Sequence, residues 1–425
     1  MNKQSSKPLL AVIAFLVGLL AITEFQFAVS ANQSSSSENT LTRDQEPVIM
    51  KGSSLMQLNG QQLDEIFVYA YKEGALTQIP AQIDEVNSEG KFVAVEDGQL
   101  DKDDELVFMS KDSGDQLPED MPLSDLLDVS EKWYEVKINN PLDAAEEAWV
   151  YVVHSTSLKK TFTDDYVKFG TTNHLMTGQT YRLRFATPDP WVDSLTLFGG
   201  TTDLLDRNKS RLDCDNLLCP ITEESAGAEV PDDVIKDGPV RAIIRNGRVL
   251  GYGEMLSWST GLQIPAFLLN NAVLQFSLDF SPAATGSTFY SKTVPSGVIV
   301  DGVPDSVQAS PVSPWVQLSS SDGTIIQVAD LTRISGDLTN YYEDDSTLDP
   351  DDTGDMMRYG ATGVIINNPD TVVEYIFNIY ILAGSQPNRG SEFEAKFNKP
   401  LKTMTTVQTR PQPETFAVFL PFVER

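Results

Sequence analysis

The stretch Glu65-Ile-Phe-Val-Tyr-Ala-Tyr71 carries the alternation that decides the fold class of this chain. Every second side chain, beginning with Ile66, would point to one face of an extended strand, and the aromatic side chains between them would point to the other face. Lys72-Glu-Gly-Ala75 supplies a turn, and residues 76–83 return as a second extended run. The pattern predicts a β-hairpin.

The same style of sequence continues to the end of the chain. Short runs rich in Val, Ile, Phe and Tyr are separated by Gly, Pro, Asn, Asp and Ser, which is typical of antiparallel sandwiches and barrels. Regular alternation of strands and helices is missing, which disfavours Rossmann and TIM-barrel folds. We therefore predict an all-β protein with minor α content, namely short helical turns such as residues 142–148, and an antiparallel β-sandwich architecture. Further strands are expected at residues 106–109, 133–138, 149–153, 181–185, 240–244, 249–258, 272–280, 297–300, 315–318, 324–329, 361–366, 372–382 and 403–409.

The chain length favours two β domains. About 394 residues remain after residues 1–31, which are interpreted below as a leader, and this number exceeds what one compact core usually holds. The polar stretch from Ser155 to Lys168 is the expected boundary. The predicted organisation is a signal peptide at 1–31, a polar Ser-rich spacer at 32–46, an N-terminal β domain at 47–158 and a larger C-terminal β-sandwich domain at 159–425.

The first 31 residues have the features of a secretory leader. Lys3 and Lys7 precede an apolar run from Pro8 to Ile22, which is shorter than the roughly 20 residues of a membrane span. Val29-Ser-Ala31 places small residues where signal peptidase cuts, so cleavage is expected after Ala31. The alternative is an uncleaved N-terminal anchor. The prediction is an exported protein, located extracellularly, at the cell surface or in the periplasm, with no membrane span after cleavage.

The charge of the chain limits its partners. It has 31 basic and 61 acidic side chains and a net charge of −30. Removal of the leader takes away Lys3, Lys7 and Glu24, leaving 29 basic and 60 acidic side chains. A field of this sign repels nucleic acid and anionic lipid and attracts cations. Nucleic-acid binding is therefore not expected.

Cys214 and Cys219 are the two cysteines of the sequence. In an oxidising compartment, an even pair this close in sequence predicts a small disulfide loop. A metal site would need more Cys or His nearby, and the two histidines, His154 and His174, are distant in sequence. We expect no organic cofactor.

Two acidic segments have the oxygen-rich spacing that Ca²⁺ prefers. The first lies within residues 84–105, where Asp and Glu alternate, although an EF-hand is disfavoured because strands flank it and Glu replaces Asp at key positions. The second, residues 343–355, holds seven carboxylates and no basic residue. The alternatives are a solvated acidic loop for the first segment and a disordered one for the second. The predicted calcium ligands are Asp101, Asp103, Glu105, Asp349, Asp351 and Asp355.

A basic patch stands out in this acidic chain. Arg241, Arg245 and Arg248 surround a predicted hairpin whose turn is Asn246-Gly247. Such a patch could hold a uronate or sulfated sugar by bidentate pairing, although salt bridges that balance the acidic surface are the simpler explanation. Trp191 lies in a loop after Pro190, which makes it the best candidate for stacking on a sugar ring.

Catalytic candidates are weak. Nucleophile-elbow and phosphate-loop motifs are missing from the sequence. The carboxylates that could act in a glycosidase-like pair are Glu254, Asp344 and Asp345, and His174 is the more loop-like of the two histidines.

These features favour a secreted or cell-surface β-sandwich protein with calcium-binding acidic loops that binds polysaccharide or another surface protein. The first alternative is a polysaccharide-active enzyme, a lyase or glycoside hydrolase, on the same fold. The second alternative is a structural envelope protein.

Overall fold

The computed structural model describes residues 37–95, 97–118, 121, 123, 132–186, 191–225 and 233–409. The described residues belong to one compact unit. The predicted leader, residues 1–31, lies outside the described residues. None of the helices in the described ranges has the length and the apolar character needed to cross a membrane.

The structure is mostly β, as predicted, and every strand pair within its sheets is antiparallel. A three-stranded sheet has the order β1-β5-β4, and a five-stranded sheet has the order β25-β6-β7-β2-β3. The strands of these two sheets are β1 (Pro47–Lys51), β2 (Ile66–Lys72), β3 (Ala75–Gln78), β4 (Ala81–Asp84), β5 (Glu105–Met109), β6 (Lys132–Asn140), β7 (Asp143–His154) and β25 (Lys402–Thr409).

The hairpin predicted from the opening stretch is confirmed. Strand β2 pairs with β3 in a register that places Tyr69 opposite Gln78, and the turn uses Glu73 and Gly74, both at positive φ. The helical turn expected at 142–148 is wrong, because strand β7 begins at Asp143 and pairs with β6. Residues 148–154 of β7 are all buried, and the pairing of β7 with β6 extends back over the less buried residues 143–147, which outweighs the local helical preference of the alanines and glutamates there.

The two sheets share an apolar core. It contains Phe108 from β5, Val136 from β6 and Val150 from β7, all fully buried. The described part of the predicted spacer packs against this core region: Arg43 is 2% exposed, pairs with Glu46 and donates a 2.7 Å hydrogen bond to the carbonyl oxygen of Lys399.

Three further sheets follow along the chain, with the orders β11-β10-β9-β8, β12-β17-β23-β22 and β13-β14-β15-β16-β24-β21-β20-β18-β19. Their strands are β8 (Lys168–Gly170), β9 (Leu175–Thr177), β10 (Tyr181–Phe185), β11 (Val192–Leu197), β12 (Leu205–Asp213), β13 (Val234–Asp237), β14 (Ala242–Ile244), β15 (Val249–Gly251), β16 (Met255–Gln263), β17 (Val273–Phe280), β18 (Thr288–Ser291), β19 (Val298–Ile299), β20 (Trp315–Ser319), β21 (Thr324–Ala329), β22 (Asp337–Asp345), β23 (Arg358–Asn367) and β24 (Val372–Leu382).

Helices are few and short. The α-helix α2 (Gly390–Asn398) packs near β20 and β21, with Phe393 buried beneath it. In the described ranges, seven single-turn 3-10 helices connect strands, namely η1 (Gly52–Ser54), η2 (Met56–Leu58), η3 (Leu63–Glu65), η4 (Ser110–Asp112), η5 (Ala266–Leu268), η6 (Pro282–Ala284) and η7 (Leu331–Arg333).

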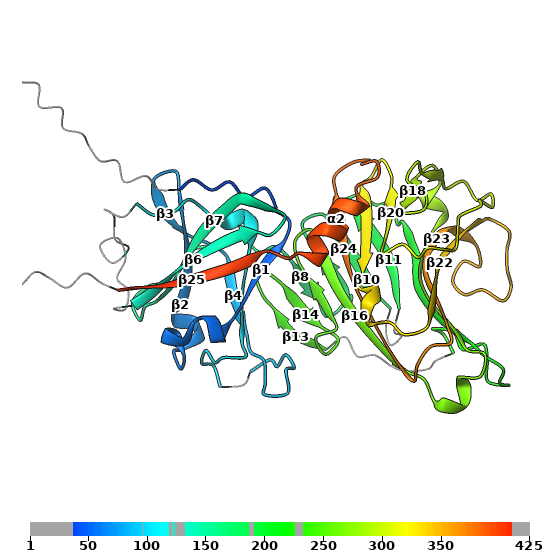
Figure 1. Cartoon of the computed structure of the whole chain (residues 1–425), viewed down its shortest axis with the longest axis horizontal. Helices are drawn as coiled ribbons and strands as arrows, with labels where there is room; N and C mark the ends of the chain where they lie inside the picture. Colours follow the sequence, from blue (N-terminus) through cyan, green and yellow to red (C-terminus); the bar gives the residue numbers. More distant parts are fainter. Residues whose placement is uncertain are drawn as a thin grey trace, which may run out of the picture. The chain divides into compact units, whose positions relative to one another are not determined.

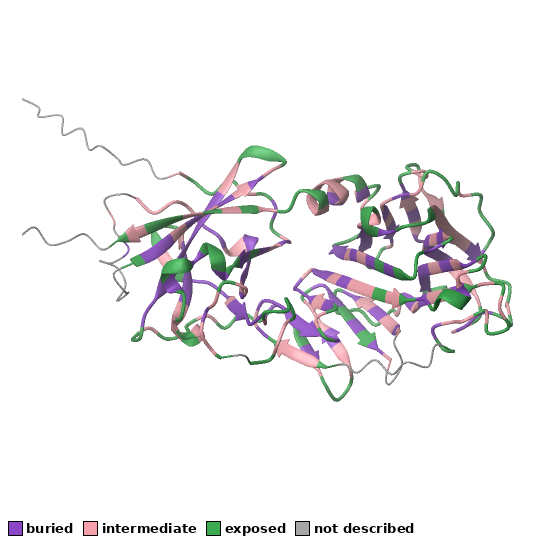
Figure 2. Cartoon of the chain, turned by 60° about the horizontal axis from the view of Figure 1, so that its bottom comes forward, coloured by how far each residue is buried: buried purple, intermediate pink, exposed green. Residues whose placement is uncertain are grey.

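The four-stranded sheet that contains β17 and the nine-stranded sheet pack face to face as a sandwich. Leu274 and Phe276 from β17 join Phe377 and Ile379 from β24 in the largest apolar core. Burial alternates along the strands, as expected when one face of a sheet packs on a core. Figure 2 shows this alternation as purple segments interrupted by pink and green ones.

The last described strand returns to the beginning of the fold. Strand β25 pairs with β6 in a register that joins Lys402 to Asn139 and Thr409 to Lys132. Figure 1 shows β25 in red beside the blue-green strands of the five-stranded sheet. The division into domains at 158/159 stays a prediction, and the N-terminal sheet includes this strand from the other end of the chain.

Candidate functional site

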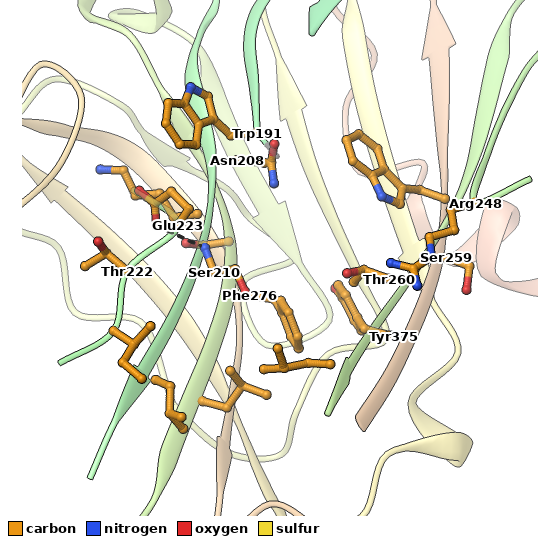
Figure 3. Close-up of a pocket in the computed structure, with 18 of the residues that line it drawn as sticks. Trp191, Asn208, Ser210, Thr222, Glu223, Arg248, Ser259, Thr260, Phe276 and Tyr375 are labelled. Atoms are coloured by element: carbon orange, nitrogen blue, oxygen red, sulfur yellow. Dashed lines mark hydrogen bonds between the residues drawn. The ribbon is translucent and has the colours of Figure 1, made fainter. Parts of the chain in front are cut away.

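A cavity of about 420 Å³ lies between the two sheets of the sandwich. Strands β12 and β17 form one wall, and β16 and β24 form the other (Figure 3). Packed protein interiors seldom leave voids much larger than a water molecule, so a space of this size between two sheets sets this region apart from the rest of the core. Its volume lies within the range of about 300–1,000 Å³ that is typical of small-molecule sites.

One half of the cavity is apolar. The rings of Phe276 from β17 and Tyr375 from β24 stack across it, with centroids 5.1 Å apart and planes 7° from parallel. Trp258 stacks on Phe377 in the same wall at 5.8 Å. The aliphatic side chains that line this half are Leu212, Ile221, Leu262, Ile264, Leu268, Leu274 and Leu278.

The other half carries polar side chains. Asn208 and Ser210 come from β12, because strand alternation turns the even-numbered residues of this strand toward the cavity. Thr260 of β16 faces them from the opposite wall, and Trp191 stands above Asn208 (Figure 3). The cavity therefore has an apolar end and a polar end.

Four charged residues border the cavity, namely Lys209, Glu223, Arg245 and Arg248. Lys209 directs its ammonium group into a buried ion-pair network. Glu223 is 3% exposed and accepts hydrogen bonds from the backbone N–H of Ser210 and the hydroxyl of Thr353. Arg245 is 3% exposed, with its guanidinium 4.5 Å from the centre of the Phe185 ring. Arg248, by contrast, is exposed.

The ion-pair network occupies the face of β12 opposite to the cavity. Lys209 is 3% exposed and contacts both Asp279 of β17 and Asp352, with 3.0 Å between its Nζ and Asp352 Oδ1. Asp352 also pairs with Arg211 of β12 and, at 3.0 Å, with Nε of Arg358. The loop that contains Asp352 is thereby tied onto the sheet.

The pKa values of Asp279 and Asp352 move in opposite directions, although both carboxylates contact Lys209. Burial raises the pKa of Asp279 to about 7, since the attraction of one lysine offsets only part of the cost of removing a carboxylate from water. Burial alone would raise the pKa of Asp352 too, but Lys209 and Arg211 bring it below its ordinary value. The number of cationic partners decides the direction.

The structure brings together three of the four predicted ligand-binding residues. Trp191, Arg245 and Arg248 all border the cavity. The predicted hairpin is present, with Arg245, Asn246 and Gly247 at positive φ and Ile244 paired with Val249. Residues 245–248 form the connection, with Asn246 and Gly247 at its centre as predicted, and the backbone N–H groups of Gly247 and Arg248 donate to the carbonyls of Ile244 and Arg245.

Arg241 lies elsewhere. It is fully buried, donates at 2.7 Å to Asp84 and at 2.6 Å to Glu105, and lies 4.9 Å from the centre of the Phe92 ring. Its guanidinium therefore joins β4 and β5 to the C-terminal part of the chain and does not border the cavity.

The predicted catalytic residues are dispersed. Glu254 is held by Lys111 at 3.3 Å and by Gln45 at 2.9 Å. Asp344 is 1% exposed and accepts the backbone N–H groups of Asp301, Gly302 and Gly360. Asp345 accepts the N–H of Thr347, which lowers its pKa, and His174 occupies a turn at positive φ. None of these four residues borders the cavity.

The predicted calcium ligands have other partners. Asp101 accepts the backbone N–H of Asp103 at 2.7 Å, Asp103 pairs with Lys102, and Glu105 pairs with Lys51 and Arg241. In the second segment, Asp349 pairs with Arg358 at 2.6 Å and accepts the N–H of Asp351, while Asp355 accepts the N–H of Met357. Across the described ranges, no group of three or more His, Cys, Asp or Glu residues is arranged to hold a metal ion. Calcium binding stays a prediction.

The disulfide between Cys214 and Cys219 is confirmed. It closes a short loop after β12, and Leu217 at its tip is fully exposed. Asn270 and Asn271 hold this loop through Asp215, which places the loop beside the end of the sandwich that bears η5.

Strand β12 and the ion pairs that its Lys209 forms with Asp279 and Asp352 were not predicted from the sequence. The segment Leu205-Asp-Arg-Asn-Lys-Ser-Arg-Leu-Asp213 contains too few apolar residues to predict a buried strand. One available signal was Asp279, an acidic residue inside the predicted strand 272–280. A charge in such a position needs a buried partner, although its identity cannot be read from local sequence.

No model of a known protein family matches the chain, and no curated protein is similar to it in sequence. Among solved structures, an alpha-mannosidase from Enterococcus faecalis V583 is 9% identical, with a TM-score of 0.37, covering 87% of this chain and 45% of that one. A protein in the glycosyl hydrolase family 38 from Enterococcus faecalis is 8% identical, with a TM-score of 0.36, covering 87% and 47%. The chain spans less than half the length of these structures.

Proposed function

We propose that this protein binds a small amphipathic molecule in the cavity between its two sandwich sheets. The observation that carries the proposal is the cavity itself, which has an aromatic and aliphatic end and a polar end within one space of about 420 Å³. A molecule with an apolar body and a polar head matches both ends. The predicted leader would place this binding outside the cytoplasm.

The apolar end supplies the affinity in this proposal. Burying a methylene group contributes about 0.8 kcal/mol, so each CH₂ added to an alkyl ligand should tighten binding up to about fourfold until the cavity is full. The rings of Phe276 and Tyr375 stack on each other, so such a chain would lie beside this pair, among the aliphatic side chains of the cavity. The ligand would lie against both sheets.

The carboxylate chemistry at the cavity favours binding over catalysis. Among the described residues, Glu223 is the one acidic side chain that borders the space, and its oxygens already accept from Ser210 and Thr353. A glycosidase needs two carboxylates across the scissile bond. Glu223 therefore forms part of the cavity wall, and the polar groups around it would orient a bound molecule.

A carbohydrate is the second candidate ligand, favoured by the position of Trp191 at the polar end. Its indole lies 5.1 Å from the guanidinium carbon of Arg207, which fixes one face of the ring. Sugar rings stack on such aromatic surfaces and bond to hydroxyl and amide side chains of the type found in Asn208 and Ser210.

Titration with a neutral apolar fluorescent dye, N-phenyl-1-naphthylamine, tests the proposal. We expect saturable binding that alkan-1-ols displace, more strongly as the chain lengthens. Soluble neutral oligosaccharides serve as the competing arm: displacement by them, and not by the alcohols, would favour the carbohydrate candidate.

A cavity-filling variant makes the test specific. Thr260→Phe places a ring in the cavity and should weaken dye binding at least about tenfold. Ser257→Phe is the matched control, because Ser257 belongs to the same strand β16 but does not border the cavity. Absence of saturable binding, or equal binding by both variants, would sink the proposal.

A further inference from the structure

Arg248 gives the polar end of the cavity an exposed positive charge, whereas the other two basic residues of the lining, Lys209 and Arg245, are buried. Lys209 is neutralised by Asp279 and Asp352, and Arg245 is buried against the ring of Phe185. Within the described parts of the chain, the side chain of Arg248 has no hydrogen bond or ion pair. Its guanidinium lies beside Thr260 in Figure 3.

The backbone holds Arg248 in place without using its side chain. Its N–H donates at 3.1 Å to the carbonyl of Arg245, and its own carbonyl accepts from Ser259 of β16 at 2.8 Å. Three successive positive φ angles, at Arg245, Asn246 and Gly247, fix the turn that precedes it. The attachment point of the guanidinium is therefore set before a ligand arrives, which lowers the entropy cost of binding.

The negative charge of the whole chain gives this arginine added weight as an anion-binding group. A net charge of −30 opposes the approach of an anion, so an anion binds only where a local cation outweighs that field. Distant charges are screened over about 8–10 Å at physiological salt, whereas a guanidinium in contact is not. Arg248 also presents the planar pair of donors that matches a carboxylate or a phosphate.

We propose that the ligand of the cavity is an anionic amphiphile, a single apolar chain or ring system ending in a carboxylate or another oxyanion that pairs with Arg248. This inference rests on the proposed function and names the class of its ligand. The apolar body would lie among aliphatic side chains such as Leu212, Leu262 and Leu274, beside the stacked rings of Phe276 and Tyr375, and the head would lie near Thr260 and Arg248.

The experiment compares three ten-carbon probes that differ only in the head group: decanoate, decan-1-ol and decylammonium. Each displaces N-phenyl-1-naphthylamine from the purified chain. We expect decanoate to bind about tenfold more tightly than decan-1-ol, and decylammonium to bind most weakly, because a partly exposed charge-assisted pair contributes about one factor of ten. Added NaCl should weaken decanoate and leave decan-1-ol unchanged.

Variants at Arg248 assign the effect to this residue. Arg248→Gln should abolish the preference for decanoate while decan-1-ol binds as before, and Arg248→Lys should keep part of it. Arg182→Gln is the matched control, since Arg182 is an exposed arginine of β10 that does not border the cavity. A second oxyanion probe, decyl phosphate, separates a requirement for carboxylate from one for any anion.

The outcomes separate this inference from the proposed function. Equal binding of decanoate and decan-1-ol overturns the anionic head, and a preference that survives in Arg248→Gln overturns its pairing with Arg248. Both results leave the amphipathic ligand standing, and Arg248 is then a solvated surface charge. Failure of all probes to bind overturns both.

Discussion

The two faces of strands β12 and β17 have opposite designs. On the outer face, Lys209 and Asp279 belong to a network whose charges are paired within the protein. On the inner face, Ser210 and Phe276 border an open space. Adjacent residues of the same strands therefore belong either to a network of paired charges or to the lining of the cavity.

The difference indicates that the inner face, and not the outer face, is suited to bind a ligand. A buried charge that lacks a partner costs several kcal/mol, so the outer face is tolerable only when its loop supplies counter-charges. Apolar side chains around a cavity forgo dispersion contacts and the burial of further apolar surface, a smaller cost for each residue. A ligand can supply those contacts, whereas the outer face has already found its partners in the chain.

The largest effect should follow loss of the central cation. Lys209→Met keeps the length of the side chain but leaves Asp279 and Asp352 without their shared ammonium group. We expect the free energy of unfolding, measured with urea, to fall by about 3–5 kcal/mol. Lys102→Met is the control, because Lys102 is largely exposed in its pair with Asp103, and it should stay within about 0.5 kcal/mol of the wild type. If the free energy of unfolding of Lys209→Met falls by less than about 1 kcal/mol, then Asp279 and Asp352 do not depend on Lys209 as their shared counter-charge.

The pH dependence of stability should reveal Asp279. Its pKa is raised to about 7 in the folded chain, above its ordinary value of 3.8, so the folded state binds more protons than the unfolded state between these values. This group therefore contributes stability at low pH that is lost as pH rises toward 7, with a slope of at most about 1.4 kcal/mol per pH unit.

Asp279→Asn removes that titration and isolates its contribution. The difference in unfolding free energy between wild type and Asp279→Asn, measured in urea at pH 5, 6, 7 and 8, should fall from pH 5 to 7 and level off above. Parallel curves for the two proteins would mean that Asp279 is ionised throughout this range and that Lys209 dominates its environment.

The smallest effect should come from calcium. The charged loop already uses Arg358 to pair with Asp349, Asp352 and Glu343. We therefore expect millimolar Ca²⁺ to leave the melting temperature within about 1 °C of that in EDTA. A rise of several degrees would confirm the calcium prediction for residues 343–355 and would show that a metal ion can replace the arginine.

The fold class could be predicted because it depends on local alternation. The hairpin of β2 and β3, the long strand β24 and the Cys214–Cys219 loop were all expected from residues that are near neighbours in sequence. Strand β12 could not be predicted this way, since its outer residues bind charges and its inner residues face a cavity, and neither face looks apolar.

The candidate site was predicted only in pieces. Trp191, Arg245 and Arg248 were singled out for their chemistry, yet their meeting at one cavity depends on packing between strands far apart in sequence. Arg358 lies three residues beyond the acidic segment, too late to be counted with it, and so the loop looked unneutralised. Arg241 pairs with Asp84, 157 residues earlier in the chain, a distance no local pattern reports.

The position of β25 bears on the order in which this chain can fold. Strand β6 pairs with a strand that begins at Lys402, so the N-terminal sheet stays incomplete until residues 402–409 have been synthesised. Such a closure is slow, because the loop entropy must be lost before the pairing is gained. Until then the unpaired edge of β6 is open to strands from other molecules, and a chain truncated before residue 402 would keep that edge permanently.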